Sequence, residues 1–405
     1  MTIASPENDQ VFQRGEAITF ALAAPVDPSH TVSWESSLDR ALGEGSQLEL
    51  QNLRPGTHTV TVRVDGAAAG TVRIQVEDRP SWNLGLLGQV TADGEAVSSD
   101  GDLLAVACSV NESCTPGVLF FDISNPAAPV LRSEYRPADL NPLTVFVSGD
   151  LVAVGGDSES GFMSTVGVRL LDLTDPADPR VLASITSVTE VQDVFIAEGF
   201  LYVAAVGSVF VFDVRDPGAP LQVAEIPAPR ASGQAFAVAV AGSRLFALFW
   251  NDVPLVRSDI LVADVSVPSA PVVLGSVLAG RGLRMGVSSD GRLAFAPDLN
   301  NKSVHIYDVS NPGNIRLAAE YRSLPGTEPR VVVVEGNRAF VSMHGGLGFG
   351  TGVEVLDIST PARPKLIGYF DLDTSGTAPT PWIESHGGGV VFAIARPQLH
   401  VLGFQ

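Results

Sequence analysis

The segments FFDISNPAAPVL (120–131), LLDLTDPADPRVL (170–182) and VFDVRDPGAPLQV (211–223) share one pattern of apolar residues, an aspartate and prolines. The pattern returns three more times, in VADVSVPSAPVVL (262–274), IYDVSNPGNIRLA (306–318) and VLDISTPARPKLI (355–367). The copies are spaced by about 40 to 50 residues, a period typical of a four-stranded structural repeat. This repetition is the strongest indication of the architecture.

Each copy lies in a unit that reads as four short strands. In the third unit these include DVFIA (193–197), LYVAAV (201–206) and LQVAEI (221–226). Runs of Val, Ile, Leu, Phe and Tyr bounded by Gly, Asp and Pro are typical of strands. We predict that the repeated aspartates cap the turn before the fourth strand rather than bind a ligand. They are Asp122, Asp172, Asp213, Asp264, Asp308 and Asp357.

The two ends of the repetitive region complement each other. The last segment, GGVVFAIARPQLHVLGFQ (388–405), contains a second and a third strand but no fourth. The segment WNLGLLGQV (82–90) reads as an isolated fourth strand. Pairing 82–90 with LHVLGF (399–404) would close the ring and remove exposed sheet edges. The sequence therefore predicts an all-β chain with a seven-bladed β-propeller over residues 82–405.

The repeats resemble the LVIVD-repeat family, whose signature is [LV]-x-[VI]-x-D-[VI]-[ST]-x-P-x-x-P. The resemblance covers residues 82–405 and is close at VGVRLLDLTDPADP (166–179) and GVEVLDISTPARP (352–364). The fifth unit departs from it, with Ile315 in place of the second proline. The family occurs in bacterial and archaeal surface or secreted proteins and has no defined catalytic motif. The resemblance thus implies a location more than an activity.

Residues 1–78 are predicted to form a small β-sandwich. The stretch THTVTVRV (57–64) alternates so that Val60, Val62 and Val64 share one face, as in a half-buried strand. The segment 33–64 resembles bacterial Ig-like and PKD-type domains, with Trp34 as the core tryptophan. We expect a spacer domain of this type, followed by a linker at 79–81.

Composition excludes several classes of function. The net charge of −20 argues against nucleic-acid binding, which needs a basic surface to displace counterions. No apolar stretch reaches the roughly 18 residues needed to span a bilayer. No charged and apolar leader follows Met1, so either the protein is cytoplasmic or a signal segment was removed. We favour the second and expect a secreted or cell-surface protein.

The two cysteines, Cys108 and Cys114, lie in one short loop, CSVNESC. A local disulfide is the preferred interpretation, and free thiols are the alternative. A metal site is disfavoured because no histidine or second cysteine pair stands beside them.

Function is expected on the face where the loops between second and third strands open, because these loops vary in length and chemistry. They are SVNES (109–113), GDSESGFMST (156–165), WNDVPLVRSD (250–259), DLNNKS (298–303) and MHGGLGFGTG (343–352). Alignment of the innermost strands places seven residues near the channel mouth: Gly94, Thr144, Asp193, Ala237, Arg284, Val331 and Trp382. Gln192, Arg330 and Glu384 lie beside them.

Asp193, Arg284, Arg330 and Trp382 are predicted to form a mixed-charge pocket for an acidic sugar or a peptide carboxylate. The alternative is that they only solvate the channel. We expect no cofactor, although Asp298–Asn301 and Asp157–Glu159 offer oxygen ligands for calcium without the spacing of a calcium loop.

Three functions remain open. The preferred hypothesis is a non-enzymatic module that binds a protein or a glycan at the cell surface. The second is a polysaccharide lyase or hydrolase, with His344 or His386 as general base and Arg284 or Arg330 neutralising the substrate carboxylate. The third is a structural subunit of a surface assembly, which would require a large exposed apolar patch.

Overall fold

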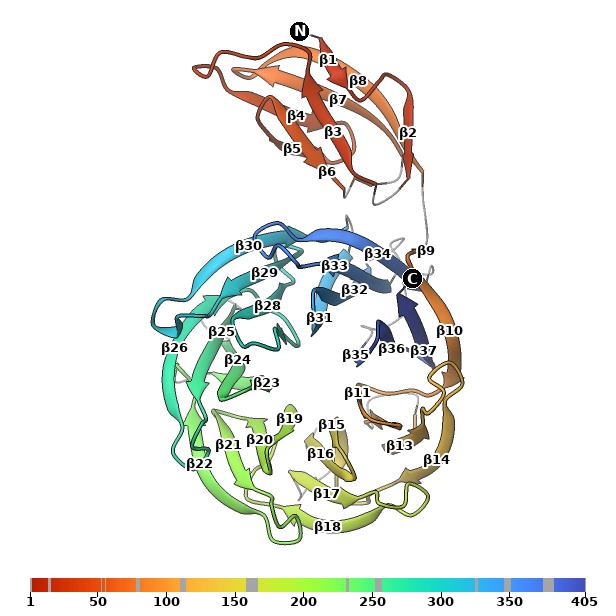
Figure 1. Ribbon diagram of the computed structural model, residues 1–405, viewed down its shortest axis with the longest axis vertical. Helices are drawn as coiled ribbons and strands as arrows, with labels where there is room; N and C mark the ends of the chain where they lie inside the picture. Colours follow the sequence, from red (N-terminus) through yellow and green to blue (C-terminus); the bar gives the residue numbers. More distant parts are fainter. Residues whose placement is uncertain are drawn as a thin grey trace.

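In a computed structural model, the described part of the chain forms β-strands and, apart from turns and loops, one 3-10 turn at Pro312–Asn314 (Figure 1). The structure describes residues 2–13, 16–51, 53–54, 56–77, 81–109, 114–157, 167–230, 233–251, 257–324, 327–345, 351–373 and 382–404. Seven sheets are arranged in a ring, and each forms one blade of four strands. One of these sheets has a fifth, short strand in addition. Two further sheets lie in the first 77 residues. The chain is therefore an all-β propeller preceded by a separate pair of sheets.

Blades 1 to 4 each run outward from the channel through four strands. Their strands are β11 (Ala96–Asp100), β12 (Leu103–Cys108), β13 (Gly117–Asp122) and β14 (Val130–Tyr135); β15 (Asn141–Ser148), β16 (Leu151–Asp157), β17 (Val168–Asp172) and β18 (Arg180–Ile185); β19 (Asp193–Ala197), β20 (Phe200–Ala205), β21 (Ser208–Asp213) and β22 (Leu221–Pro227); β23 (Gln234–Ala241), β24 (Arg244–Asn251), β25 (Arg257–Asp264) and β26 (Val272–Ala279).

Blades 5 to 7 complete the ring. Their strands are β27 (Gly286–Val287), β28 (Leu293–Asp298), β29 (Ser303–Asp308) and β30 (Arg316–Arg322); β31 (Thr327–Glu335), β32 (Arg338–Gly345), β33 (Thr351–Asp357) and β34 (Lys365–Asp373); β35 (Trp382–Gly387), β36 (Val390–Ala395), β37 (Gln398–Phe404) and β10 (Leu84–Thr91).

Apolar side chains between neighbouring blades hold the ring together. Each middle strand is buried on both faces, as in β12, whose six residues are all buried. The resulting contacts form one apolar cluster at each of the seven blade interfaces, including the interface between blades 7 and 1. Burial of a Val, Leu or Phe side chain contributes about 1.5–3 kcal/mol. The middle strands are apolar along their length because neighbouring blades cover both of their faces.

The repeated aspartates cap the turns before the outer strands, as predicted. Each Asp Oδ1 accepts a hydrogen bond from the backbone N–H two residues later, at Ser124, Thr174, Arg215, Ser266, Ser310 and Ser359. These bonds lower the pKa of each aspartate, most strongly where an arginine also binds, as for Asp213, whose pKa is about 2. The aspartates are therefore structural.

The ring closes between β10 and β37, but the predicted closing strand 82–90 is divided. Leu84 pairs with Phe404 and Thr91 with Gln398 at the two ends of this ladder. Ser81–Trp82 instead forms β9, which adds to the outer edge of β34 in blade 6. Asn83 separates the two strands because its φ of 52° breaks the extended conformation, and its side chain donates to Ile367 O at 2.7 Å. The predicted linker 79–81 thus already enters the ring at residue 81.

The first 77 residues form two sheets packed around one core. One sheet has the order β1 (Ile3–Ser5), β3 (Ile18–Leu22), β6 (Gln47–Leu50); the other has the order β2 (Gln10–Gln13), β8 (Ala67–Glu77), β7 (Gly56–Val64), β4 (Val32–Ser36), β5 (Arg40–Glu44). Trp34, 1% exposed, packs against Phe20 at 5.7 Å between the ring centroids. Val60 and Val62 are fully buried, as their alternation predicted. The Ig-like identity and the boundary at 78 stay predictions.

The two faces of the ring differ in the connections they carry. We call the face with the connections between second and third strands, where the innermost strands begin, the loop face. The turn face carries the hairpins between first and second strands and the aspartate-capped turns. Among the described residues, no helix is long and apolar enough to cross a membrane.

Candidate functional site

Five of the seven residues aligned at the channel mouth occupy one register position. Each of the five pairs with the same position of the second strand in its blade. The pairs are Thr144–Gly155, Asp193–Ala204, Ala237–Leu248, Val331–Ser342 and Trp382–Ile394. Gly94 precedes its innermost strand β11, and Arg284 precedes β27. The alignment was therefore correct for these five blades and wrong for Gly94, whose blade has Ala96 at the equivalent position. Arg284 lies before the two paired residues of β27 but bridges to Val331, one of the five.

Asp193 joins the innermost strands of three consecutive blades. Its Oδ1 accepts from Thr144 Oγ1 of blade 2 at 3.2 Å and from its own neighbour Val194 N at 3.1 Å. Its Oδ2 accepts from Val238 N of blade 4 at 3.0 Å. Burial, at 6% exposure, raises the pKa of Asp193, while Arg284 and these hydrogen bonds oppose that rise. Asp193 is thus a structural connector as well as a channel-facing carboxylate.

Arg284 is displaced from its own blade toward blade 6. The innermost strand of blade 5, β27, is only Gly286–Val287, and Arg284 instead forms a parallel bridge with Val331. Arg284 N donates to Arg330 O at 3.3 Å, and Val332 N donates to Arg284 O at 3.1 Å. The backbone around Arg284 is therefore fixed against the innermost strand of blade 6.

Three charged side chains face one another across the channel. Arg284 interacts electrostatically with Asp193 of blade 3 and with Glu384 of blade 7. Blades 3, 5 and 7 are not adjacent in the ring (Figure 1). The electrostatic interaction between their side chains therefore acts across the channel. Burial raises the pKa of Glu384 to about 7, with Asp193 also raising it and Arg284 lowering it. The channel thus holds one guanidinium and two carboxyl groups whose pKa values burial raises.

A second charged group lies where blade 6 begins. Arg330 Nη2 pairs with Glu328 Oε2 at 2.9 Å, and Glu328 lies opposite His344 in the ladder between β31 and β32. Arg330 is the extra residue of a β-bulge between Pro329 and Val331, a device that re-aims a side chain. Burial and the nearby Arg330 lower the pKa of His344, so its imidazole is neutral at pH 7. Arg330 and His344 thus belong to one group at the loop face.

Aromatic residues at the mouth are packed rather than open. Trp382 packs partly against the apolar clusters on both sides of blade 7. Trp250 stacks on Phe236 with 3.7 Å between centroids, and the Arg281 guanidinium lies 4.7 Å from the Trp250 ring centroid. Because Phe236 fills one face of Trp250, Arg281 covers the other. Trp250 therefore has both ring faces covered, whereas Trp382 is partly buried between blades.

The sequence reasoning missed Arg281, Trp250 and Glu328. Trp250 pairs with Gln234 in the same register as His344 with Glu328. Alignment of the innermost strands alone does not reveal this equivalence. Alignment of the ends of the second strands identifies Trp250 as the counterpart of His344. Arg281 precedes the irregular start of blade 5, where no repeat position exists to align.

Other predicted candidates lie elsewhere or outside the described residues. His386 is at the turn-face end of β35, four residues from Trp382, and its Nδ1 is 3.2 Å from Ser99 Oγ. The Asp298 carboxylate accepts from Asn300 N and from Asn301 N and Nδ2. Among the described residues no cluster of three His, Cys, Asp or Glu forms a metal site. Residues 110–113, 158–166, 252–256 and 346–350, and Glu159 with them, fall outside the described residues.

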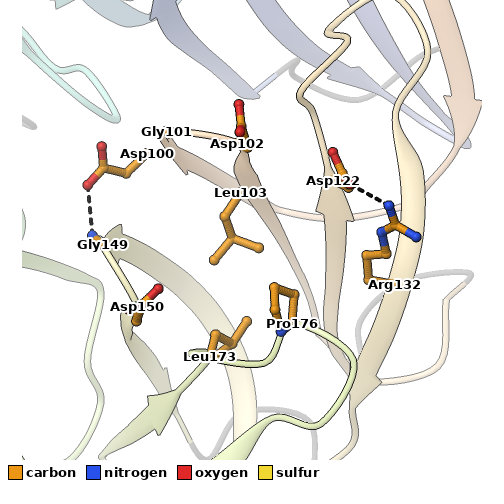
Figure 2. Close-up of a pocket in the computed structure, with 10 residues that line it drawn as sticks. All are labelled: Asp100, Gly101, Asp102, Leu103, Asp122, Arg132, Gly149, Asp150, Leu173 and Pro176. Carbon is orange, nitrogen blue, oxygen red and sulfur yellow. Dashed lines mark hydrogen bonds and ion pairs between the residues drawn. The ribbon is translucent and has the colours of Figure 1, made fainter.

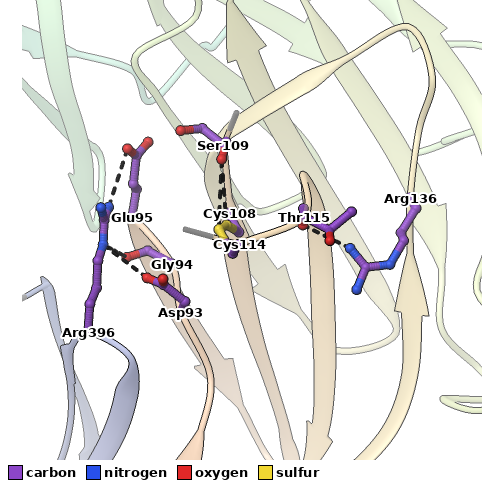
Figure 3. Close-up of a disulfide and its surroundings, with 9 residues drawn as sticks. All are labelled: Asp93, Gly94, Glu95, Cys108, Ser109, Cys114, Thr115, Arg136 and Arg396. Carbon is purple, nitrogen blue, oxygen red and sulfur yellow. Dashed lines mark hydrogen bonds and ion pairs between the residues drawn. A yellow bond between two sulfur atoms is a disulfide. The ribbon is translucent and has the colours of Figure 1, made fainter. Parts of the chain in front are cut away.

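Cys108 and Cys114 form a disulfide on the loop face, with their Cα atoms 6.4 Å apart (Figure 3). A pocket of about 580 Å³ lies beside it, between blades 7 and 1. Arg396 crosses this interface and pairs with Asp93 at 3.1 Å and with Glu95 at 3.3 Å. The charges beside the disulfide are thus paired with each other.

Comparison with known proteins identifies the repeat and the fold. The LVIVD repeat family matches residues 117–136, 189–225 and 329–372, which lie in blades 1, 3 and 6. These segments make up about a quarter of the chain. No curated protein matches the sequence.

Solved β-propellers cover most of the chain. The β-propeller domain of Cps50 (Swd1) from Myceliophteria thermophila is 12% identical, with a TM-score of 0.58 over 80% of this chain and 100% of that chain. Sqt1 from Chaetomium thermophilum is 12% identical, with a TM-score of 0.54 over 78% and 98%. A complex of KlAtg21 with the coiled coil of AgAtg16 contains a chain that is 12% identical, with a TM-score of 0.56 over 75% and 91%. At these identities the likeness shows the fold alone.

Proposed function

We propose that this β-propeller with LVIVD repeats is a non-enzymatic binding module that is secreted or displayed at the cell surface. The observation that carries the proposal is the set of charged side chains from blades 3, 5 and 7 that meet in the channel beside the group of Arg330 and His344. The disulfide supports an oxidising location. One propeller of similar fold is solved with a coiled-coil partner, which supports a protein ligand. The N-terminal sandwich serves as a spacer.

The chemistry of the mouth favours an anionic group on the ligand. Arg284 and Arg330 present guanidinium groups, which bind carboxylates through paired hydrogen bonds. Glu384, with its pKa of about 7, is protonated in much of the population at neutral pH and then donates rather than repels. An acidic sugar or a peptide carboxylate satisfies both features.

The test is a glycan and peptide array on the intact chain, repeated with Arg284→Ala and Arg330→Ala together. We expect the double variant to lose binding by about 100-fold, since truncating a buried charge partner costs about 2–5 kcal/mol. Arg180→Ala is the matched control, because Arg180 is 69% exposed on the turn face. Binding that is equal in the double variant and the wild type would contradict a site at the channel mouth.

Ligand binding should weaken as pH rises through 7. Above this pH Glu384 ionises and repels an anionic ligand; below it the carboxyl is neutral. A ligand carboxylate keeps its charge from about pH 8 to about pH 6, so we expect affinity about three- to tenfold higher at the lower pH. Isothermal titration at both pH values measures the change. Glu384→Gln should bind at both with the affinity of the wild type at the lower pH; an unchanged pH dependence in this variant would refute the role of Glu384.

A lyase or hydrolase remains the alternative, favoured by one observation. His344 is a neutral imidazole beside Arg330, an arrangement suited to a base next to a substrate carboxylate. Incubation with polyuronates, read by absorbance of the unsaturated product and by reducing ends, distinguishes the two. Turnover that is lost in His344→Ala would replace the binding proposal with the enzymatic one.

A structural subunit is the third candidate. The outer strand β26 carries no charged residue, and Val272, Val273 and Leu278 are 58%, 51% and 41% exposed. Uncharged apolar edge strands promote association through their edges. Sedimentation of the wild type and of Val273→Lys tests this: a concentration-dependent oligomer that the variant abolishes would favour assembly.

A further inference from the structure

A pocket of about 330 Å³ opens on the turn face between blades 1 and 2 (Figure 2). The hairpins of the two blades form its sides, and Gly101 (φ 53°) and Gly149 (φ 57°) make the tight turns there. Leu103, Leu173 and Pro176 supply an apolar floor. This face is opposite the channel mouth considered above, so the pocket belongs to a different surface.

Four carboxylates line the pocket. Two of them have partners within the fold, and the other two have none among the described residues. Asp100 Oδ2 accepts from Gly149 N at 2.7 Å, and Asp122 pairs with Arg132, which neutralises that arginine. Asp102 and Asp150 are exposed, one on each blade, and neither side chain has a hydrogen bond or ion pair among the described residues. The pocket therefore combines an apolar floor with two uncompensated negative charges.

The repeat shows that these charges are particular to this pocket. Asp102 O and Asp150 O accept from Ile123 N and Leu173 N, and the same backbone bond defines the equivalent residue in every blade. The other five equivalents, in blades 3 to 7, are Gly199, Ser243, Arg292, Asn337 and Gly389. Only blades 1 and 2 carry an acid here, and they are neighbours.

The equivalent cleft between blades 4 and 5 already holds a guanidinium. Arg244, which stands where blade 1 has Leu103, donates to Gly291 O at 3.2 Å, Val309 O at 3.0 Å and Ser310 O at 3.3 Å. The same position in blade 6 is Arg338, whose guanidinium lies 4.4 Å from the Phe404 ring centroid in blade 7. The fold thus accommodates an arginine side chain in this cleft. Blade 1 has Leu103 at the equivalent position, so no guanidinium of its own occupies the cleft.

We propose that the pocket between blades 1 and 2 receives an arginine side chain from a partner protein. Its guanidinium lies at the carbonyls of Gly149, Leu173 and Thr174, which are the counterparts of those that Arg244 binds, and Asp102 and Asp150 neutralise its charge. The aliphatic stem covers Leu103 and Pro176. The net charge of −20 attracts a basic partner to this surface.

The test uses the intact chain with 13C-labelled leucine methyl groups and Nα-acetyl-arginine amide as the probe. We expect the probe to shift the methyl signals of Leu103 and Leu173, while the uncharged isostere Nα-acetyl-citrulline amide shifts them at least about tenfold less, because charge-assisted bonds are about twice as strong as neutral ones. Equal shifts with both probes, or no shift at these methyl groups, would overturn the proposal.

Two variants separate the site from the fold. Asp102→Asn with Asp150→Asn should weaken the probe's affinity about tenfold, and Leu103→Arg should abolish binding by filling the cleft as Arg244 does. Asp290→Asn, on the same face in blade 5, is the control and should bind as the wild type. Methyl signals in blades 4 to 6 report that each variant is folded. Retained affinity in folded Leu103→Arg would exclude this pocket.

Discussion

Deletion of residues 1–91 should leave a propeller that is unfolded or aggregated, whereas deletion of residues 1–80 should leave it folded. The longer deletion removes β10 and with it the whole ladder to β37, from Leu84–Phe404 to Thr91–Gln398. It also removes Leu84, which is 2% exposed in the cluster between blades 6 and 7. An unpaired β37 becomes an edge that invites pairing with other chains.

Gel filtration and thermal unfolding measure the outcome. Loss of Leu84 costs about 1.5–3 kcal/mol of burial before the ladder is counted. The deletion of 1–80 keeps β9 and β10 and serves as the matched control, which also tests whether the sandwich is a separate domain. If both truncated chains are monomeric with the same melting temperature, the ring does not depend on β10.

Replacement of Asp193 by alanine should lower the free energy of unfolding by about 3 kcal/mol. The side chain accepts from Thr144, Val194 and Val238, and its loss leaves buried donors without acceptors in three blades. An unsatisfied buried donor costs about 1–3 kcal/mol, and not all three costs add, because a channel can admit water. Loss of the carboxyl group also removes one of the two acidic side chains that interact with Arg284.

Urea unfolding followed by tryptophan fluorescence gives the change. Asp178→Ala is the control, because Asp178 is 66% exposed and its pair with Arg180 contributes at most about 1 kcal/mol. A change below that of the control would show that Asp193 does not connect the blades.

Much of the fold was predictable because the same short-range pattern recurs. An aspartate followed by turn prolines fixes each tight turn locally, so six copies suffice to place the strands. The division of the closing strand was not predictable, because both β9 and β10 are short and either could pair with an outer edge. It depends on the left-handed conformation of Asn83 and its bond to Ile367 O, which is remote in sequence.

Most of the charged residues at the channel mouth were predictable by alignment of the innermost strands. Asp193 and Glu384 lie in full innermost strands, so alignment placed them in the channel. The same alignment placed Arg284 at the channel mouth, but its bridge to Val331 of blade 6 was not predictable, because this long-range pairing has no local signal. The pocket between blades 1 and 2 joins side chains about 50 residues apart, so only comparison of equivalent hairpin positions in neighbouring repeats reveals it.

The closing ladder sets the order of events during synthesis. Strand β10 leaves the ribosome about 300 residues before its partner β37, a delay of about 15–60 s at bacterial and eukaryotic elongation rates. Throughout this interval the nascent ring is open and Leu86 and Leu87 are on an unpaired strand. The seven residues of β37, Gln398–Phe404, therefore decide whether the nascent chain forms a closed ring or an open arc.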